Sequence, residues 1–113
     1  MTNYLISFPS GVMELSEEDF QLVADEAHAV VRAAKEAGVL VFAGGIDEEV
    51  PPFLVFADGV VSDEVYPQPT RLNGGFCVLD LSSREEAVEW AARTAKACRC
   101  AQEVRQFQHD PEQ

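Results

Sequence analysis

The sequence is short of basic residues and of long hydrophobic runs. Its 113 residues contain 20 Asp and Glu against 8 Lys and Arg, which gives a formal net charge of −12. Nucleic-acid backbones and anionic membrane surfaces bind clustered Lys and Arg, so this balance opposes both as partners. No apolar run approaches the roughly 18 residues of a membrane-spanning helix. The N-terminus lacks a basic region followed by an apolar one, so we expect no signal peptide and a cytoplasmic location.

Cysteine and histidine are also scarce. The odd number of cysteines, Cys77, Cys98 and Cys100, favours reduced thiols in a chain without a secretion signal. A structural zinc site needs four ligands, and beside the Cys98 and Cys100 pair only Cys77, His28 and His109 remain, scattered along the chain. The sequence also lacks a nucleophile elbow, a phosphate-binding glycine loop and a dinucleotide fingerprint. We therefore expect no metal and no cofactor.

Residues 73–90, NGGFCVLDLSSREEAVEW, predict a turn, a strand and the start of a helix. Residues 76–81 are apolar on both alternating faces except for Asp80, which is typical of a strand buried on both sides. Ser83 and Glu86 have the spacing of a capping box, in which each side chain satisfies a free backbone N–H group. Residues at helical spacing then predict a packing stripe. It comprises Ala87, Trp90, Ala91, Thr94 and Ala95.

The N-terminal part predicts a strand, a long helix and a second strand. Residues 3–8 alternate as a strand does. Ser16 has the place of an N-cap, and Gly38 has that of the glycine after the last helical turn. Residues 39–43 follow as a strand closed by two glycines. The first strand face comprises Tyr4, Ile6 and Phe8, and the helix stripe comprises Phe20, Val23, Ala27, Val30, Val31 and Ala34.

The remaining segments predict a hairpin and a last strand. Residues 53–56 and 60–61 are β-rich, and a two-residue connection, Asp58-Gly59, between such runs favours a hairpin. Residues 62–72 predict a loop, and residues 101–107 alternate as a strand. The order is therefore β-α-β-hairpin-β-α-β, which is the ferredoxin-like arrangement with an inserted hairpin.

We predict an α+β fold with a single domain over residues 1–108 and a polar tail over residues 109–113. Helices on one face of the sheet leave the other face open, and the strands near Val39 and Phe76 are too apolar for water. We expect a homodimer that buries these faces against each other with two-fold symmetry. A small-molecule pocket can share that space.

Several blocks of sequence, in one order, carry a family resemblance. Residues 37–44, AGVLVFAG, are followed by Asp58-Gly59, by residues 74–80, GGFCVLD, by residues 83–92, SREEAVEWAA, and by residues 103–107, EVRQF. This set is similar to the YCII-related family, in its DGPF-type branch. The resemblance implies a small dimeric α/β barrel.

The signature loop of that branch is changed in this chain. The place of Asp-Gly-Pro-Phe, eleven residues before the paired glycines, holds Asp63-Glu64-Val65-Tyr66, so the turn is less constrained. Some members have a His and an Asp suggested as a catalytic pair. The resemblance implies those roles for Asp63 and for His28, which is about one residue out of step, a rotation of roughly 100° on a helix.

Four side chains are candidates for chemistry or ligand contact, each with a structural alternative. His28 suits a general base at neutral pH, or is a half-exposed helix histidine. Asp63 suits proton abstraction or a ligand hydrogen bond, or caps a turn. Tyr66 offers a hydroxyl at the barrel mouth, or packs. Asp47 follows the second strand at the same mouth, or is simply solvated.

Asp80 and the arginines offer a further choice. A charge within an apolar strand needs a partner, so we expect Asp80 to pair with Arg105 or to cap the second helix. Arg71 and Arg105 are alternatively contacts for an anionic ligand.

Two function classes follow. The first is a cofactor-free acid–base enzyme acting on a small metabolite, with His28 and Asp63 catalytic and with Tyr66, Arg105 and Asp47 as ligand contacts. The alternative is a non-enzymatic dimeric module that binds a ligand or a protein; a purely structural dimer is a third option. A closed pocket with His28 and an acid within hydrogen-bond reach favours the enzyme, and a dry apolar pocket favours the module.

Overall fold

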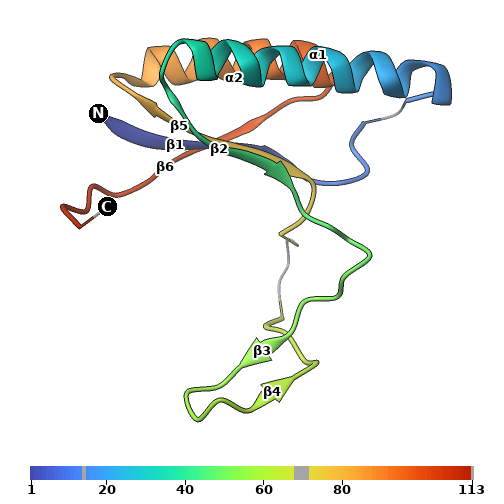
Figure 1. The fold of residues 1–113 in the computed structure, drawn as a ribbon, viewed down its shortest axis with the longest axis vertical. Coiled ribbons are helices and arrows are strands. Elements are labelled where there is room, and N and C mark those ends of the chain that lie inside the picture. The colour runs from blue at the N-terminus through green and yellow to red at the C-terminus, as the bar shows by residue number, and fades with distance from the viewer. Residues whose placement is uncertain (14, 68–71, 113) are drawn as a thin grey trace.

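A computed structural model describes residues 1–13, 15–67 and 72–112. Two helices lie side by side on one face of a sheet, and a hairpin stands beyond the opposite face (Figure 1). The elements are β1 (Thr2–Phe8), α1 (Glu17–Glu36), β2 (Leu40–Gly45), β3 (Leu54–Val55), β4 (Val61–Ser62), β5 (Gly75–Leu81), α2 (Arg84–Cys98) and β6 (Glu103–Gln106). No helix in the described part is long and apolar enough to cross a membrane.

The main sheet has four strands in the order β2-β5-β1-β6, and every neighbouring pair is antiparallel. Each helix connects two strands that are not neighbours, since β5 lies between β1 and β2, and β1 lies between β5 and β6. The predicted α+β class is confirmed, and this sheet with its two helices is compatible with the ferredoxin-like arrangement. The predicted inserted hairpin is β3 and β4, which form a separate two-stranded sheet.

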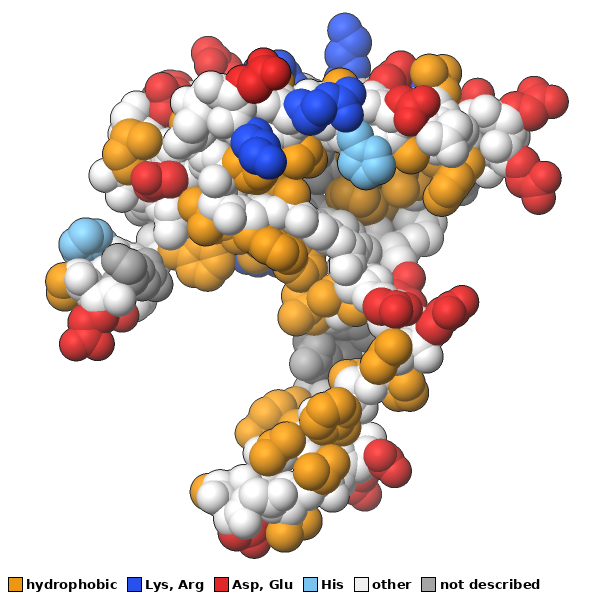
Figure 2. Space-filling view, viewed as in Figure 1, with side chains coloured by type: hydrophobic (Ala, Val, Ile, Leu, Met, Phe, Trp, Pro, Cys, Tyr) orange, Lys and Arg blue, Asp and Glu red, His pale blue; other side chains and the backbone are white. Residues whose placement is uncertain are grey.

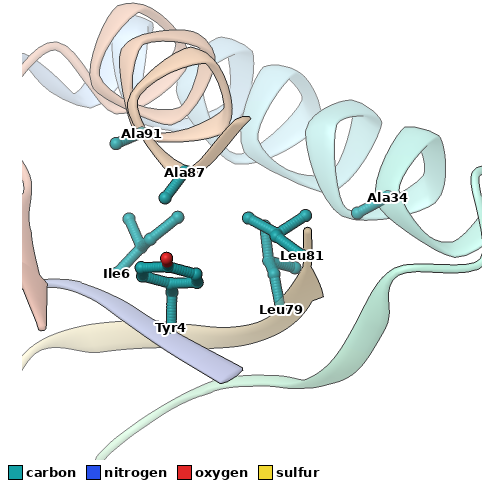
Figure 3. Packing of buried hydrophobic residues seen from close by; sticks show 7 residues of the cluster. All are labelled: Tyr4, Ile6, Ala34, Leu79, Leu81, Ala87 and Ala91. Atoms are coloured by element: carbon teal, nitrogen blue, oxygen red, sulfur yellow. The ribbon is translucent and has the colours of Figure 1, made fainter. Parts of the chain in front are cut away.

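The core lies between the helices and the two central strands. Side chains of β1 and β5 point toward the helices, and small side chains of α2 and α1 meet them (Figure 3). Alanines at these helical positions let the helix backbones approach the sheet closely. The buried cluster comprises Tyr4, Ile6, Ala34, Leu79, Leu81, Ala87 and Ala91.

The predicted stripe of α1 is wrong at its N-terminal end. Val23 and Ala34 are buried as expected, but Phe20 is 63% exposed. The first turns of α1 extend past the ends of the strands (Figure 1), and Phe20 belongs to this part of the helix. The end of the helix is as predicted, because Gly38 has the positive φ of +75° that a glycine after the last turn adopts.

Both predicted helix caps are present. The backbone N–H of Asp19 donates to Ser16 Oγ over 3.4 Å, and that of Glu86 donates to Ser83 Oγ over 3.2 Å. The return contact of the second cap differs from the expected box, because the Glu86 carboxylate accepts from the backbone N–H of Ser82, over 2.8 Å. This hydrogen bond lowers the pKa of Glu86.

Two strand ends and one turn differ from the sequence prediction. The paired glycines that were expected to close β2 belong to it, with Gly45 opposite Gly75 in the ladder. The hairpin loop has three residues rather than two, because the Phe56 N–H donates to the Val60 carbonyl oxygen over 2.9 Å. Gly59, with a φ of +87°, supplies the left-handed position that such a loop requires. The last strand is shorter than predicted.

Candidate functional site

A cavity of about 310 Å³ lies between the helices and the sheet. Its floor belongs to the core, since Ile6, Ala34 and Leu79 contribute to both. The wall on the α1 side comprises Ala27, His28, Val30 and Val31, and the wall on the α2 side comprises Trp90, Thr94 and Cys98. The lining is mostly apolar, which is typical of small-molecule sites with a few polar groups.

Glycines leave room for the cavity at one end of the sheet. Gly45 and Gly75 are opposite each other in the β2–β5 ladder. Residues two apart in a strand lie on the same face of the sheet, so this pair shares a face with the pair of Ala43 and Cys77. That face is the one turned toward the helices. Without side chains at this point, the sheet does not fill the space under α1. The ring of Phe8 lies beside Gly75, and Phe8 also lines the cavity.

Gln102 supplies the most unusual polar group of the lining. It follows α2 and precedes β6, and its Nε2 donates to the carbonyl oxygen of Cys100 over 3.2 Å. Its Oε1 is buried and, among the described residues, has no hydrogen-bond partner. A buried acceptor without a partner is destabilising by about 1–3 kcal/mol. Gln102 also lines the cavity, so its unpaired oxygen is a polar group close to the site.

Two thiols in the lining are protonated at neutral pH. Burial, together with the nearby Cys98, raises the pKa of Cys77 to about 11. Burial, together with Cys100, also raises the pKa of Cys98. Neutral thiols behave as small apolar groups and are poor nucleophiles. Thr94 Oγ1 donates to the Trp90 carbonyl oxygen over 2.9 Å, which leaves its lone pairs as acceptors.

The structure does not bring the two predicted catalytic side chains together. His28 is exposed at the rim of the cavity. Asp63 follows β4 in the hairpin and is exposed, and no hydrogen bond or ion pair within the described ranges joins it to His28. No Asp or Glu is among the described residues that line the cavity. The turn after β4 is stabilised by Ser62, whose Oγ accepts from the Glu64 N–H over 3.2 Å.

The three predicted ligand contacts lie outside the cavity. Tyr66 is 73% exposed in the segment that follows β4. Asp47 is exposed in the loop after β2, where its Oδ1 accepts from the Glu49 N–H over 3.1 Å. Arg105 lies on β6. None of these three residues is among the described residues that line the cavity.

The expected pair of Asp80 with Arg105 is wrong. Asp80 lies on β5 opposite Asn3 of β1, and β1 separates β5 from the strand of Arg105. The Arg105 guanidinium instead pairs with Glu103 on its own strand, at 2.6 Å. Asp80 does not cap α2 either, since Ser83 is the N-cap. Arg71, the other predicted anion contact, lies outside the described residues.

In the described part of the chain, no group of three or more His, Cys, Asp or Glu side chains has an arrangement that could hold a metal ion. Cys77, Cys98 and Cys100 are free thiols.

Comparison with known proteins gives no assignment. No family model matches the sequence, and no curated protein matches it. The likeness to the YCII-related family therefore depends on the sequence blocks alone.

Sequence reasoning missed Gln102 as a site residue. The only available signal was indirect: Trp90, Thr94 and Cys98 recur every four residues on α2, so that polar atoms lie within an apolar helix stripe. Such a stripe indicates either a core in which these polar atoms have hydrogen-bond partners or the wall of a cavity. Nothing in the local sequence marks Gln102, because its position depends on the path of the chain after α2.

Proposed function

We propose that this protein binds a small, mainly apolar molecule in the cavity between its helices and its sheet. The ligand donates one hydrogen bond to Gln102 Oε1 and packs against the apolar walls. The observation that supports this most directly is Gln102, which lines a cavity of about 310 Å³ and whose Oε1 is buried without a hydrogen-bond partner among the described residues. A cavity of roughly half this volume already accepts benzene in another protein, so a two-ring molecule is of suitable size.

The binding module has more support than the acid–base enzyme. A general base needs a reacting proton within hydrogen-bond reach, and an acid beside His28 was the expected sign of an enzyme. Among the described residues the cavity lining contains His28 and no carboxylate. The protonated thiol of Cys77 offers no nucleophile in its place.

We further propose that the protein is a homodimer related to the YCII proteins, with the open sheet faces turned toward each other. Leu5, Val78 and Phe42 form a row of apolar side chains across β1, β5 and β2 on that face. An apolar sheet face of this kind is typical of an interface.

A thermal-shift comparison of indole with 1-methylindole tests the ligand proposal. The two rings have nearly the same shape, but only indole has an N–H donor. A ligand of the folded state raises the melting temperature by mass action. We expect a larger shift with indole, and we expect the difference to vanish in Gln102→Met. Equal shifts with both compounds in the unaltered protein, or none with either, would contradict the proposed site.

A further inference from the structure

The chain exposes more surface than its mass requires. Its solvent-accessible surface is 8549 Å² and its Cα radius of gyration is 15.9 Å. A monomeric protein of this mass exposes about 6,100 Å², and a chain of this length has a radius of about 13 Å. The chain therefore exposes roughly 2,400 Å² more than expected for its mass. If each of two copies buried half of this excess, the interface would bury about 2,400 Å² in total, which is more than the roughly 1,600 Å² of a standard interface.

Much of this surface belongs to the hairpin, which we call the arm (residues 50–66). In the arm, Val55 is paired with Val61, and both are about 60% exposed. A two-stranded hairpin alone is only marginally stable in water, so this arm needs an apolar surface to pack against. Hydrophobic side chains cover it in Figure 2. The exposed ones are Val50, Phe53, Val55, Phe56, Val60, Val61, Val65 and Tyr66.

The base of the arm is fixed to the sheet. The Ile46 N–H donates to the Gly74 carbonyl oxygen over 2.8 Å, directly beyond the Gly45–Gly75 pair. The Ser10 N–H donates to Asn73 Oδ1 over 3.0 Å, which ties the returning chain to the end of β1. From this base the arm projects to the side of the sheet away from the helices (Figure 1).

The open sheet face lies on that same side. Its apolar row of Leu5, Val78 and Phe42 continues into Arg105, the residue opposite Leu5 on β6. The other described Lys and Arg residues belong to the helices or to the cap of α2. The arm and its base carry only acidic charges among their described residues. These are Asp47, Glu48, Glu49, Asp58, Asp63 and Glu64.

We propose that the arm of each copy lies against the open sheet face of a second copy. The contact goes beyond a simple face-to-face dimer, because the arm supplies the apolar surface that covers the partner's sheet. Each copy has one arm and one open face on the same side. A two-fold axis therefore places the arm of each copy on the open face of the other, and both faces are covered. Arg105 is paired with Glu103 on its own strand, so the proposed contact depends on apolar side chains rather than on charge. The contact builds on the dimer proposed above, and the experiment separates the two.

Site-specific photo-cross-linking in a mixed dimer tests this contact. Benzoylphenylalanine replaces Phe56 in the arm of 15N-labelled protein, which is mixed with unlabelled protein before irradiation. We expect cross-linked peptide pairs of mixed label that join the arm to the strands of Leu5, Phe42 or Val78. The same cross-linker at Phe20, an exposed aromatic residue of α1, is the matched control and should give no such pairs.

Sedimentation of variants gives a second readout. Val61→Lys should weaken dimerisation at least 100-fold, whereas Val88→Lys, at a similarly exposed position on α2, should leave it unchanged. Circular dichroism checks that the helices persist. A monomeric unaltered protein would overturn both the arm contact and the dimer. A dimer whose arm cross-links only within one copy, or to another arm, would overturn the arm contact alone.

Discussion

The side-chain Nε2 of Gln102 donates to the Cys100 carbonyl oxygen over 3.2 Å, and this contact fixes the orientation of the amide. Reversing the amide would place two acceptors against each other. This orientation leaves Oε1 buried and without a hydrogen-bond partner in the part of the chain that the structure describes. The proposed ligand site depends on this difference between the two ends of the amide, of which Nε2 is paired and Oε1 is not.

Gln102→Met removes that acceptor and keeps the size of the side chain. The free energy of unfolding of the ligand-free protein should rise by about 0.5–1 kcal/mol, because relief of a buried unpaired acceptor outweighs the lost hydrogen bond. Urea unfolding at a fixed protein concentration measures this change. Gln106→Met, an exposed glutamine of β6, is the control and should change little. A loss above about 1 kcal/mol in Gln102→Met would mean that Oε1 is satisfied.

Gly45→Val should block ligand binding without unfolding the protein. A β-carbon on Gly45 would meet only the Gly74 carbonyl oxygen, at 3.5 Å, which is an ordinary contact. The added methyl groups enter the cavity from the sheet side, so the indole-induced melting shift should fall at least several-fold. Ala92→Val, on the exposed surface of α2, adds the same groups elsewhere. An unchanged indole shift in Gly45→Val would argue for a different binding place.

Gly74→Ala should be far more damaging than Gly38→Ala. Both glycines have a positive φ, +80° and +75°. A β-carbon on Gly38 would meet nothing, whereas one on Gly74 would collide with the carbonyl oxygen of Phe8 and lie 2.9 Å from the Ser10 nitrogen. We expect a loss of about 1–2 kcal/mol for Gly38→Ala from backbone strain alone. Gly74→Ala should lose at least ~3 kcal/mol, since the clash adds to that strain. Equal losses in thermal or urea unfolding would contradict the close approach.

The stability of the protein should fall as the pH rises from about 9 to 11. Burial raises the pKa of Cys77 from 9.0 to about 11. In this window the unfolded thiol releases its proton while the folded one retains it, so the unfolded state is favoured. Cys98 shifts in the same direction. Melting temperatures between pH 8 and 10.5 should therefore fall less steeply in Cys77→Ala than in the unaltered protein. Parallel curves would show that the Cys77 thiol is not buried.

The elements could be predicted from the sequence because their signals are local. Ser16 and Ser83 cap helices through contacts within four residues, and Gly38 ends α1 through its own backbone conformation. The alternation of β1 and β5 also predicted which side chains share a face, but not which face would meet the helices. Phe20 was wrongly included in the core because its exposure depends on where the sheet ends beneath α1, which no local pattern encodes.

The site was less predictable than the fold because it depends on long-range placement. Asp63 was chosen from a family motif, yet the arm takes it away from the body of its own chain. The proposed Asp80–Arg105 pair assumed that β5 and β6 were neighbours, whereas β1 lies between them. Gln102 was missed because its position depends on the path of the chain after α2, where its Nε2 meets the carbonyl oxygen of Cys100. Only the position of His28 at the cavity rim agrees with a role near a ligand.

The most direct test of the proposed site is a nuclear magnetic resonance titration of 15N-labelled protein with indole. The side-chain amide of Gln102 gives its own pair of resonances, which report on the group that should receive the ligand. We expect these resonances to shift together with those of the backbone amides of Cys77 and Cys98, and we expect 1-methylindole to leave the Gln102 side-chain resonances nearly unchanged. Shifts confined to the arm or to the open sheet face would contradict it.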